Sequence, residues 1–153
     1  FLLIPIWESF YFYWIHRFLH IPFLYKHVHA LHHRNINVGP WSGLSMHPVE
    51  HVIFLGSVMI HWIIAAHPVH ILFHLQYYAL TAATTHTGFE GVAVKDENRL
   101  ALGTFHHQMH HRYFECNYGS LEIPWDKFFG SFHDGTVEAD KRMKERRIRM
   151  MGN

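Results

Sequence analysis

The sequence has one cysteine and few charged residues for its length of 153. Cys116 has no partner for an internal disulfide, and a single cysteine cannot build a cysteine-rich zinc module, so it is expected only to pack. Lysine and arginine number 13 against 12 acidic residues, and they form no basic groove with interleaved aromatics, so a nucleic-acid surface is excluded. A glycine-rich phosphate loop, a Gly-x-Ser-x-Gly elbow and a Rossmann fingerprint are also absent.

Histidine is abundant instead, with 18 residues, more than lysine and arginine together. The pattern His-x-x-His-His occurs at 29–33 and again at 107–111, and a His-x-x-x-His pair occupies 16–20. On a helix, positions i, i+3 and i+4 share a face, so each pattern predicts imidazoles directed toward one spot. Neutral imidazole is a common metal ligand, and one zinc ion takes only three or four protein ligands. Two metal ions are therefore predicted, with eight histidines as candidate ligands and His86 as a ninth: His16, His20, His29, His32, His33, His107, His110 and His111.

Other polar residues near these patterns are candidates for supporting roles. Glu50, Glu90 and Asp126 are carboxylates that could accept the second N–H of a ligand imidazole, or could be surface charges. His106 abuts a histidine pattern but lies off its face, so it is a neighbour of the ligands or a surface residue. No catalytic residue is expected beyond the metal ligands. The remaining histidines are interpreted as packing, interface or structural residues, and they include His27, His61, His67, His70, His74 and His133.

Two apolar runs, 52–66 and 69–85, are joined by His67-Pro68 and predict a helical hairpin over about 48–85. Their 15 and 17 residues fall short of the roughly 20 needed to cross a bilayer. The hairpin is expected either to just span a membrane or to dip into it, with a buried hairpin in a water-soluble protein as the alternative. No lysine or arginine lies between Arg34 and Lys95, and this pattern places both flanks in the cytoplasm.

The expected fold is all-α, with residues 1–153 forming one domain: a membrane helical bundle that carries the transmembrane or dipping hairpin. A histidine-rich cytoplasmic cap is expected from 16–47 and 86–140. One helix should end near 15–20 and a proline-induced break should follow at Pro22, after which 24–34 should be helical. Because the chain begins at Phe1 within an apolar run, it is expected to be a piece of a longer protein.

The ordered motifs resemble those of the fatty acid hydroxylase superfamily, and the sterol C5-desaturase branch is closest in pattern. In fatty acid 2-hydroxylases a further histidine stands at the position of Glu90, so the resemblance carries over nine ligands and not ten. It also implies a role for His47 beside the ligands or the substrate. The matching motifs are HRFLH at 16–20, HALHH at 29–33, HPVE at 47–50, HTGFE at 86–90, HHQMHH at 106–111 and NYGSLEIPWDKFFGSF at 117–132. Two iron ions, for which zinc could substitute in a purified sample, are then implied to bind His16, His20, His29, His32, His33, His86, His107, His110 and His111.

The resemblance implies a membrane-bound, dioxygen-dependent di-iron oxidoreductase that hydroxylates or desaturates a sterol-like or fatty-acyl lipid in lipid biosynthesis. Its partners would be the lipid, the bilayer and a separate electron donor, either cytochrome b5-like or a ferredoxin with its reductase. Its site would face the cytoplasm from a bacterial inner membrane or the endoplasmic reticulum. Two alternatives are a bis-His membrane haem protein and a membrane metal transporter or store, which would need His61, His67 and His74. An aromatic lining for the lipid is suggested from Phe10, Tyr11, Tyr13, Trp14, Trp41, Tyr77 and Tyr78.

Overall fold

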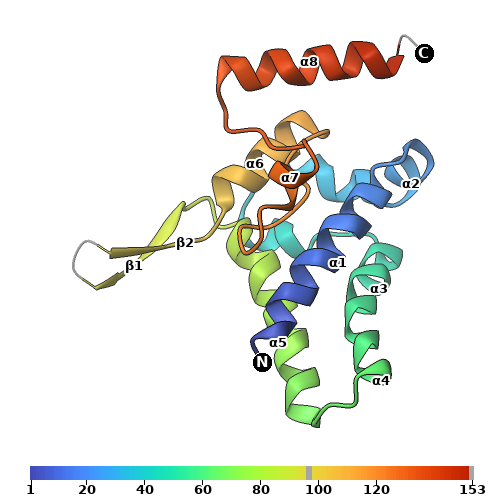
Figure 1. The fold of residues 1–153 in the computed structure, drawn as a ribbon, viewed down its shortest axis with the longest axis vertical. Helices are drawn as coiled ribbons and strands as arrows, with labels where there is room; N and C mark the ends of the chain where they lie inside the picture. Colours follow the sequence, from blue (N-terminus) through green and yellow to red (C-terminus); the bar gives the residue numbers. More distant parts are fainter. Residues whose placement is uncertain (96–97, 152–153) are drawn as a thin grey trace.

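The computed structural model describes residues 1–95 and 98–151, and most of them are helical (Figure 1). The helices are α1 (Leu3–Leu19), α2 (Pro22–His27), α3 (Pro48–Leu55), α4 (Ile60–Ile63), α5 (Pro68–Thr85), α6 (Thr104–Tyr113), α7 (Trp125–Phe128) and α8 (Val137–Met151). Three 3-10 segments are η1 (His29–Arg34), η2 (Pro40–Leu44) and η3 (Gly56–Met59), and two strands are β1 (Gly91–Lys95) and β2 (Asn98–Ala101).

The two strands depart from the all-α expectation. They pair antiparallel, with Val92 opposite Leu100, and the hairpin projects from the body of the molecule (Figure 1). Val92 and Val94 alternate with smaller or polar residues, and β-branched residues at every second position favour a strand. The all-α expectation rested on the histidine spacing and the apolar runs, neither of which includes this strand of five residues.

The break expected at Pro22 is confirmed, because α1 ends at Leu19 and α2 starts with the proline at its first position, where the missing N–H costs nothing. The prediction of a continuous helix over 24–34 is wrong. The chain leaves the helical conformation at Val28, with φ −124° and ψ −59°, and continues as η1. Val28 packs in the core against Leu19 and Phe54, and this turn directs the following histidines inward.

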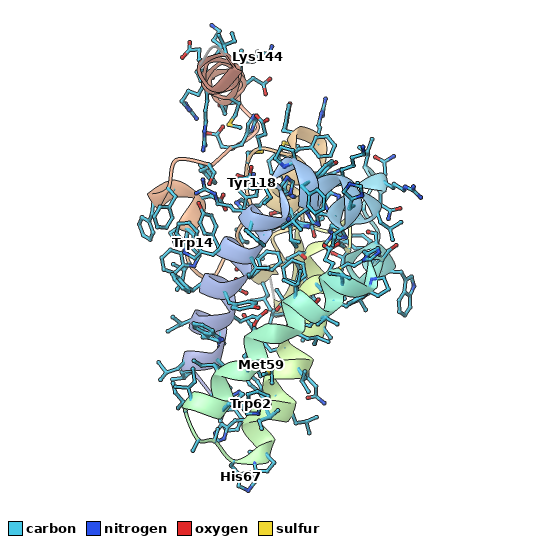
Figure 2. All side chains as sticks on the ribbon, turned by 90° about the vertical axis from the view of Figure 1, so that its right-hand side faces the viewer. Trp14, Met59, Trp62, His67, Tyr118 and Lys144 are labelled. Atoms are coloured by element: carbon cyan, nitrogen blue, oxygen red, sulfur yellow. The ribbon has the colours of Figure 1, made fainter. Side chains whose placement is uncertain are left out.

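The predicted hairpin is present, with α3, η3 and α4 as its first arm and α5 as its second. Both arms begin with a His-Pro step, and the Nδ1 atoms of His47 and His67 accept N–H groups of the first turns at 3.2 Å. His67 lies at the far tip of the hairpin (Figure 2). Within the described residues, no helix combines the length and the apolar content that crossing a membrane requires.

The hydrophobic core is small and lies between α1, α3 and α5. It consists of Leu19, Val28, Phe54 and Tyr78, with partly buried residues around it. Most of the other fully buried large side chains are histidines, so the histidine-rich region is itself part of the interior. Helix α8, which carries Lys144, stands apart from the body at the end opposite the hairpin tip (Figures 1 and 2).

Candidate metal centre

Nine histidines converge in two groups above the hairpin. Within each group, one ring nitrogen from every member lies within 4.8 Å of the others, and no other side chain among residues 1–95 and 98–151 belongs to either group. The nine are the same histidines that the sequence singled out. The five-histidine group contains His16, His20, His29, His33 and His110, and the four-histidine group contains His32, His86, His107 and His111.

Each His-x-x-His-His motif is divided between the two groups, so the expectation that one motif serves one spot is wrong. In η1, the rings of His29 and His33 stand nearly edge-on, at 81°, and both enter the five-histidine group. His32 stacks on His29 with ring centroids 5.4 Å apart and a 24° interplanar angle, and it enters the other group. The stacked rings of His29 and His32 are displaced from each other, so their nitrogens reach two different groups.

The motif in α6 repeats this arrangement with the groups exchanged. His107 and His111 stand at 72° and share the four-histidine group, while His110 stacks on His107 at 5.5 Å and 25° and enters the five-histidine group. Each motif therefore gives its i and i+4 rings to one group and its i+3 ring to the other. The two motifs interlock, and neither group is complete without both.

The Nε2 atoms in the groups face one another at short and similar distances. In the five-histidine group, Nε2 of His33 lies 3.0 Å from that of His29, 3.2 Å from that of His20 and 3.1 Å from that of His110. In the four-histidine group, Nε2 of His111 lies 3.2 Å from those of His86 and His107. Two nitrogens about 2.1 Å from one metal ion and at right angles to each other are about 3.0 Å apart. Both donor sets therefore fit a metal ion.

The opposite ring nitrogen of several group members is tied to the protein. The Nδ1–H groups of His16, His110 and His86 donate to backbone carbonyls at 2.7, 2.6 and 2.7 Å, those of Tyr118, Cys116 and Ala82 respectively. Nδ1 of His29 donates to Oε1 of Glu50 at 2.6 Å. With the proton on Nδ1, the lone pair is on Nε2 and points into the group, as a metal ligand requires.

Burial keeps these imidazoles neutral. It lowers the pKa of His16 and His86 to about 4, that of His111 to about 3 and that of His20 to about 2. Neighbouring imidazoles lower the pKa of His16, His20 and His111 further. The same causes push the pKa of the other five members well below the ordinary value. Removing a charged imidazolium from water is unfavourable, so the groups hold the protonation state that binds metals.

The carbonyls of Cys116 and Tyr118 belong to a loop that Asp126 holds in place. Its carboxylate, 2% exposed, accepts the N–H groups of Tyr118 and Gly119 at 2.9 and 2.8 Å and the hydroxyl of Ser131 at 2.6 Å. Asp126 thus acts on the ligands through the loop, and the suggestion that it accepts an imidazole N–H of a ligand directly is wrong. Because every residue has a carbonyl, no sequence signal marks these backbone partners.

Among the five residues suggested to support the ligands, only Glu50 hydrogen-bonds to a group member within the described residues. Glu90 accepts the N–H of Phe105 at 2.9 Å, at the start of α6. His47 caps α3, as described above. His106 has its Nε2 3.7 Å from Oδ2 of Asp126, outside both groups. His133 packs flat on Tyr113 and bonds Asp140, consistent with the expected structural role.

A pocket with a cavity volume of about 40 Å³ reaches both groups from the hairpin side. His16 and His29 line it from the five-histidine group, and His32, His86 and His107 line it from the four-histidine group. Apolar walls come from Phe12, Met46, Phe54, Tyr78 and Ala82. Of the seven aromatic residues suggested to line a lipid site, only Tyr77 and Tyr78 do so; Phe10, Trp14 and Trp41 are exposed.

Fold and site together define a class of protein: a mainly helical chain with two buried histidine groups able to hold metal ions. The sequence pattern of the fatty acid hydroxylase family matches residues 1–131. The chain belongs to that family, which confirms the resemblance drawn from the motifs.

The curated relatives carry sterol desaturase and oxidase names. The chain is 32% identical over 130 residues to a Delta(7)-sterol 5(6)-desaturase of Gibberella zeae. The aligned region covers 84% of this chain and 40% of that relative. It is 37% identical over 129 residues to lathosterol oxidase of Rattus norvegicus, covering 82% of this chain and 42% of the relative. The chain thus spans about two fifths of the length of these relatives. No solved structure matches the chain.

Proposed function

We propose that this chain is the metal-binding catalytic part of a membrane-associated, dioxygen-dependent di-iron enzyme that desaturates or hydroxylates a lipid. The observation that carries the proposal is the convergence of nine imidazole nitrogens on two positions beside one apolar pocket. The five-histidine group would hold one ion and the four-histidine group the other. Two iron ions bound there would supply activation of dioxygen and removal of hydrogen from an unactivated C–H bond.

The protein's own contribution is position and exclusion of water. Hydrogen bonds orient the ligand imidazoles, and they are accepted by Glu50 and by the carbonyls of Cys116, Tyr118 and Ala82. An imidazole held in this way need not reorient when a metal binds. The apolar pocket walls hold an alkyl or ring system against both groups. Relatives named for Delta(7)-sterols favour a sterol-like substrate, with a fatty-acyl lipid as the wider class.

A membrane is the proposed location because the hairpin side exposes large apolar residues. Leu2, Trp62 and Ile63 are each more than 80% exposed, and Trp62 and Met59 lie on the outer side of the hairpin (Figure 2). Exposed apolar surface of this kind favours contact with lipid or with another protein. We propose that the hairpin is inserted in the bilayer with its His67-Pro68 tip reaching the hydrated headgroups of the far leaflet, and that the histidine groups face the cytoplasm. A separate electron donor, cytochrome b5-like or a ferredoxin with its reductase, would deliver electrons.

A haem site is disfavoured by the donor sets, because a bis-His haem iron takes two imidazoles and here five and four converge. Transport or storage of metal through the hairpin is disfavoured because His61 and His74 lie outside both groups. An absorption spectrum without a Soret band and an iron content of two per chain are the expected results for the purified full-length protein.

The function is tested by profiling lipids of cells that express the full-length protein and are fed a Delta(7)-sterol. We expect a new double bond or hydroxyl that depends on dioxygen and a reductant. His110→Ala should abolish the product, because His110 is fully buried in the five-histidine group. Unchanged lipids with the wild-type protein would contradict the proposed activity, and full turnover by His110→Ala would contradict the site.

A further inference from the structure

A second set of polar side chains lies inside the hairpin, away from the two histidine groups. His74 of α5 and Ser57 of η3 are fully buried, and Glu8 of α1 is 4% exposed. Apolar residues such as Ile4 and Phe73 flank them along the same helices. Burying a carboxyl group and an imidazole costs free energy unless they are paired, and these groups are paired with each other.

The side chains of His61, His74 and Glu8 form a hydrogen-bonded chain in which each N–H donor points toward Glu8. Nε2 of His61 lies 3.2 Å from Nδ1 of His74, and Nε2 of His74 lies 2.9 Å from Oε2 of Glu8. Since a carboxylate oxygen accepts, Nε2 of His74 carries the proton and its Nδ1 accepts from Nε2–H of His61. Ser57 Oγ lies 3.2 Å from the same Nε2 of His74 and forms a side branch. Three helices, α1, α4 and α5, each supply one member.

Both ends of this chain open into pockets. His61 lines a pocket with a cavity volume of about 340 Å³ near the tip of the hairpin, with Trp7, His67 and His70 also in its wall. Glu8 lines the other pocket, the one that reaches the histidine groups. Eight residues separate Glu8 from His16 on α1, a rise of roughly 12 Å along the helix. The three side chains therefore join the hairpin tip to the far end of the substrate pocket.

We propose that His61, His74 and Glu8 form a proton relay into the substrate pocket. A proton arriving at Nδ1 of His61 releases the Nε2 proton to Nδ1 of His74, and the Nε2 proton of His74 passes to Oε2 of Glu8. One N–H bond forms for each that breaks, the last proton ends on the carboxylate, and no electrons move. Rotation of the two rings, or passage of protons back, restores the starting arrangement.

The relay rests on the proposed function, which consumes protons. Removing two hydrogens from a lipid while reducing dioxygen to two waters takes up two electrons from the donor protein and two protons from outside the substrate. The pocket beyond Glu8 also has polar walls at Thr81 and Thr85, and Oγ1 of Thr85 lies 3.1 Å from Nδ1 of His86. These hydroxyls continue a polar path from Glu8 toward the four-histidine group.

The arrangement of ring nitrogens separates this chain from a metal site. In the two histidine groups, five and four imidazole nitrogens converge, whereas in the relay Nε2 of His61 faces one acceptor nitrogen and Nε2 of His74 faces a carboxylate oxygen. Carrying protons explains why polar residues cross an otherwise apolar hairpin without joining either group.

The test uses the full-length enzyme in membranes, with a Delta(7)-sterol as the substrate probe. We expect Glu8→Gln and His61→Gln to lower kcat roughly tenfold or more, the scale of one lost proton-transfer group. KM and metal content should be unchanged, and the solvent isotope effect on kcat should increase. The double variant should be no slower than the slower single variant, because the two groups act in series. His27→Gln is the control, since His27 is an exposed histidine of α2 that lines neither pocket.

Infrared spectroscopy gives a second readout that needs no turnover. The carboxyl band of Glu8, assigned by its loss in Glu8→Gln, should shift in His74→Phe and stay in place in His27→Gln. Wild-type kcat and isotope effect in both Glu8→Gln and His61→Gln would overturn the relay even in an active enzyme. An unshifted band in His74→Phe would overturn it as well. A wild-type protein inactive on the sterol would instead count against the proposed function, and the infrared result would still decide the hydrogen-bonded chain.

Discussion

The two histidine groups are built from the same motif pair but differ in what α1 and α5 add. Each group takes two rings from one His-x-x-His-His motif and one from the other. Helix α1 then adds His16 and His20 to the first group, while the end of α5 adds only His86 to the second. An ion held by four nitrogens keeps more coordination positions for small ligands than an ion held by five.

The supports of the two groups differ in the same sense. The five-histidine group is held by Glu50 and by the loop that Asp126 pins, whereas His86 relies on the carbonyl of Ala82 within its own helix. The first group therefore has more ligands and more hydrogen-bonded supports than the second. Substitutions can therefore be chosen to affect one group at a time.

The largest contrast is expected from two double variants that each remove two imidazoles. His32→Ala with His33→Ala takes one ligand from each group, whereas His33→Ala with His110→Ala takes both from the five-histidine group. We expect the first pair to weaken the binding of both ions, and the second to release the ion of the five-histidine group while leaving the other unchanged. Metal analysis of the purified full-length protein measures this, with exposed His27→Ala as the control. Equal metal content in the two double variants would break the assignment of neighbouring histidines to different groups.

A smaller and selective effect is expected at Glu50, which accepts the Nδ1 proton of His29. Glu50→Gln should weaken metal binding by about 10- to 100-fold, the usual effect of removing such a partner, and only in the five-histidine group. Chelator competition would show one ion released early and the other unchanged. Glu90→Gln serves as the matched control because Glu90 contacts a backbone N–H and no group member. Equal weakening of both ions would argue that Glu50 supports the whole cap.

The four-histidine group is sensitive at Gly43, where η2 packs on α5. A Cβ at this position would lie 2.1 Å from the carbonyl oxygen of Ala82 and 2.9 Å from Nδ1 of His86. Gly43→Ala should therefore destabilise the fold by about 1–3 kcal/mol, as overpacking does, and loosen the ion held by His86 first. Thermal unfolding and chelator competition measure the two effects. Gly39→Ala, where a Cβ meets nothing within 4 Å, should change neither.

Low pH is expected to affect the two histidine groups almost equally, because burial lowers the pKa of the histidines in both. The folded-state pKa of His16 and of His86 is about 4, below the unfolded value of about 6.5. Between these values the unfolded chain binds more protons than the folded one, so stability falls as pH drops below about 6.5. Thermal unfolding against pH should show a plateau above pH 7 and a decline below it. Stability that increased from pH 6.5 to 5 would contradict neutral buried imidazoles.

Much of the site could be predicted from the chain because its ligands are of one type and regularly spaced. His107, His110 and His111 were placed correctly near His16 and His29, since a helical hairpin returns the chain to the level where it left. The division of each motif between two groups could not be predicted. It depends on ring stacking of His29 on His32 and of His107 on His110, which is a matter of side-chain rotation and not of spacing.

The sequence alone determined which residues gather, because histidine at helical intervals, a lysine-free and arginine-free hairpin and a proline break are local properties of the chain. Tertiary structure alone decided which partner each ring nitrogen meets. The carbonyls of Cys116 and Tyr118, the carboxylate of Glu50 and the path from His61 to Glu8 join residues distant in the chain. Hydrogen bonds depend on distance and direction in space, and only the packed helices set both.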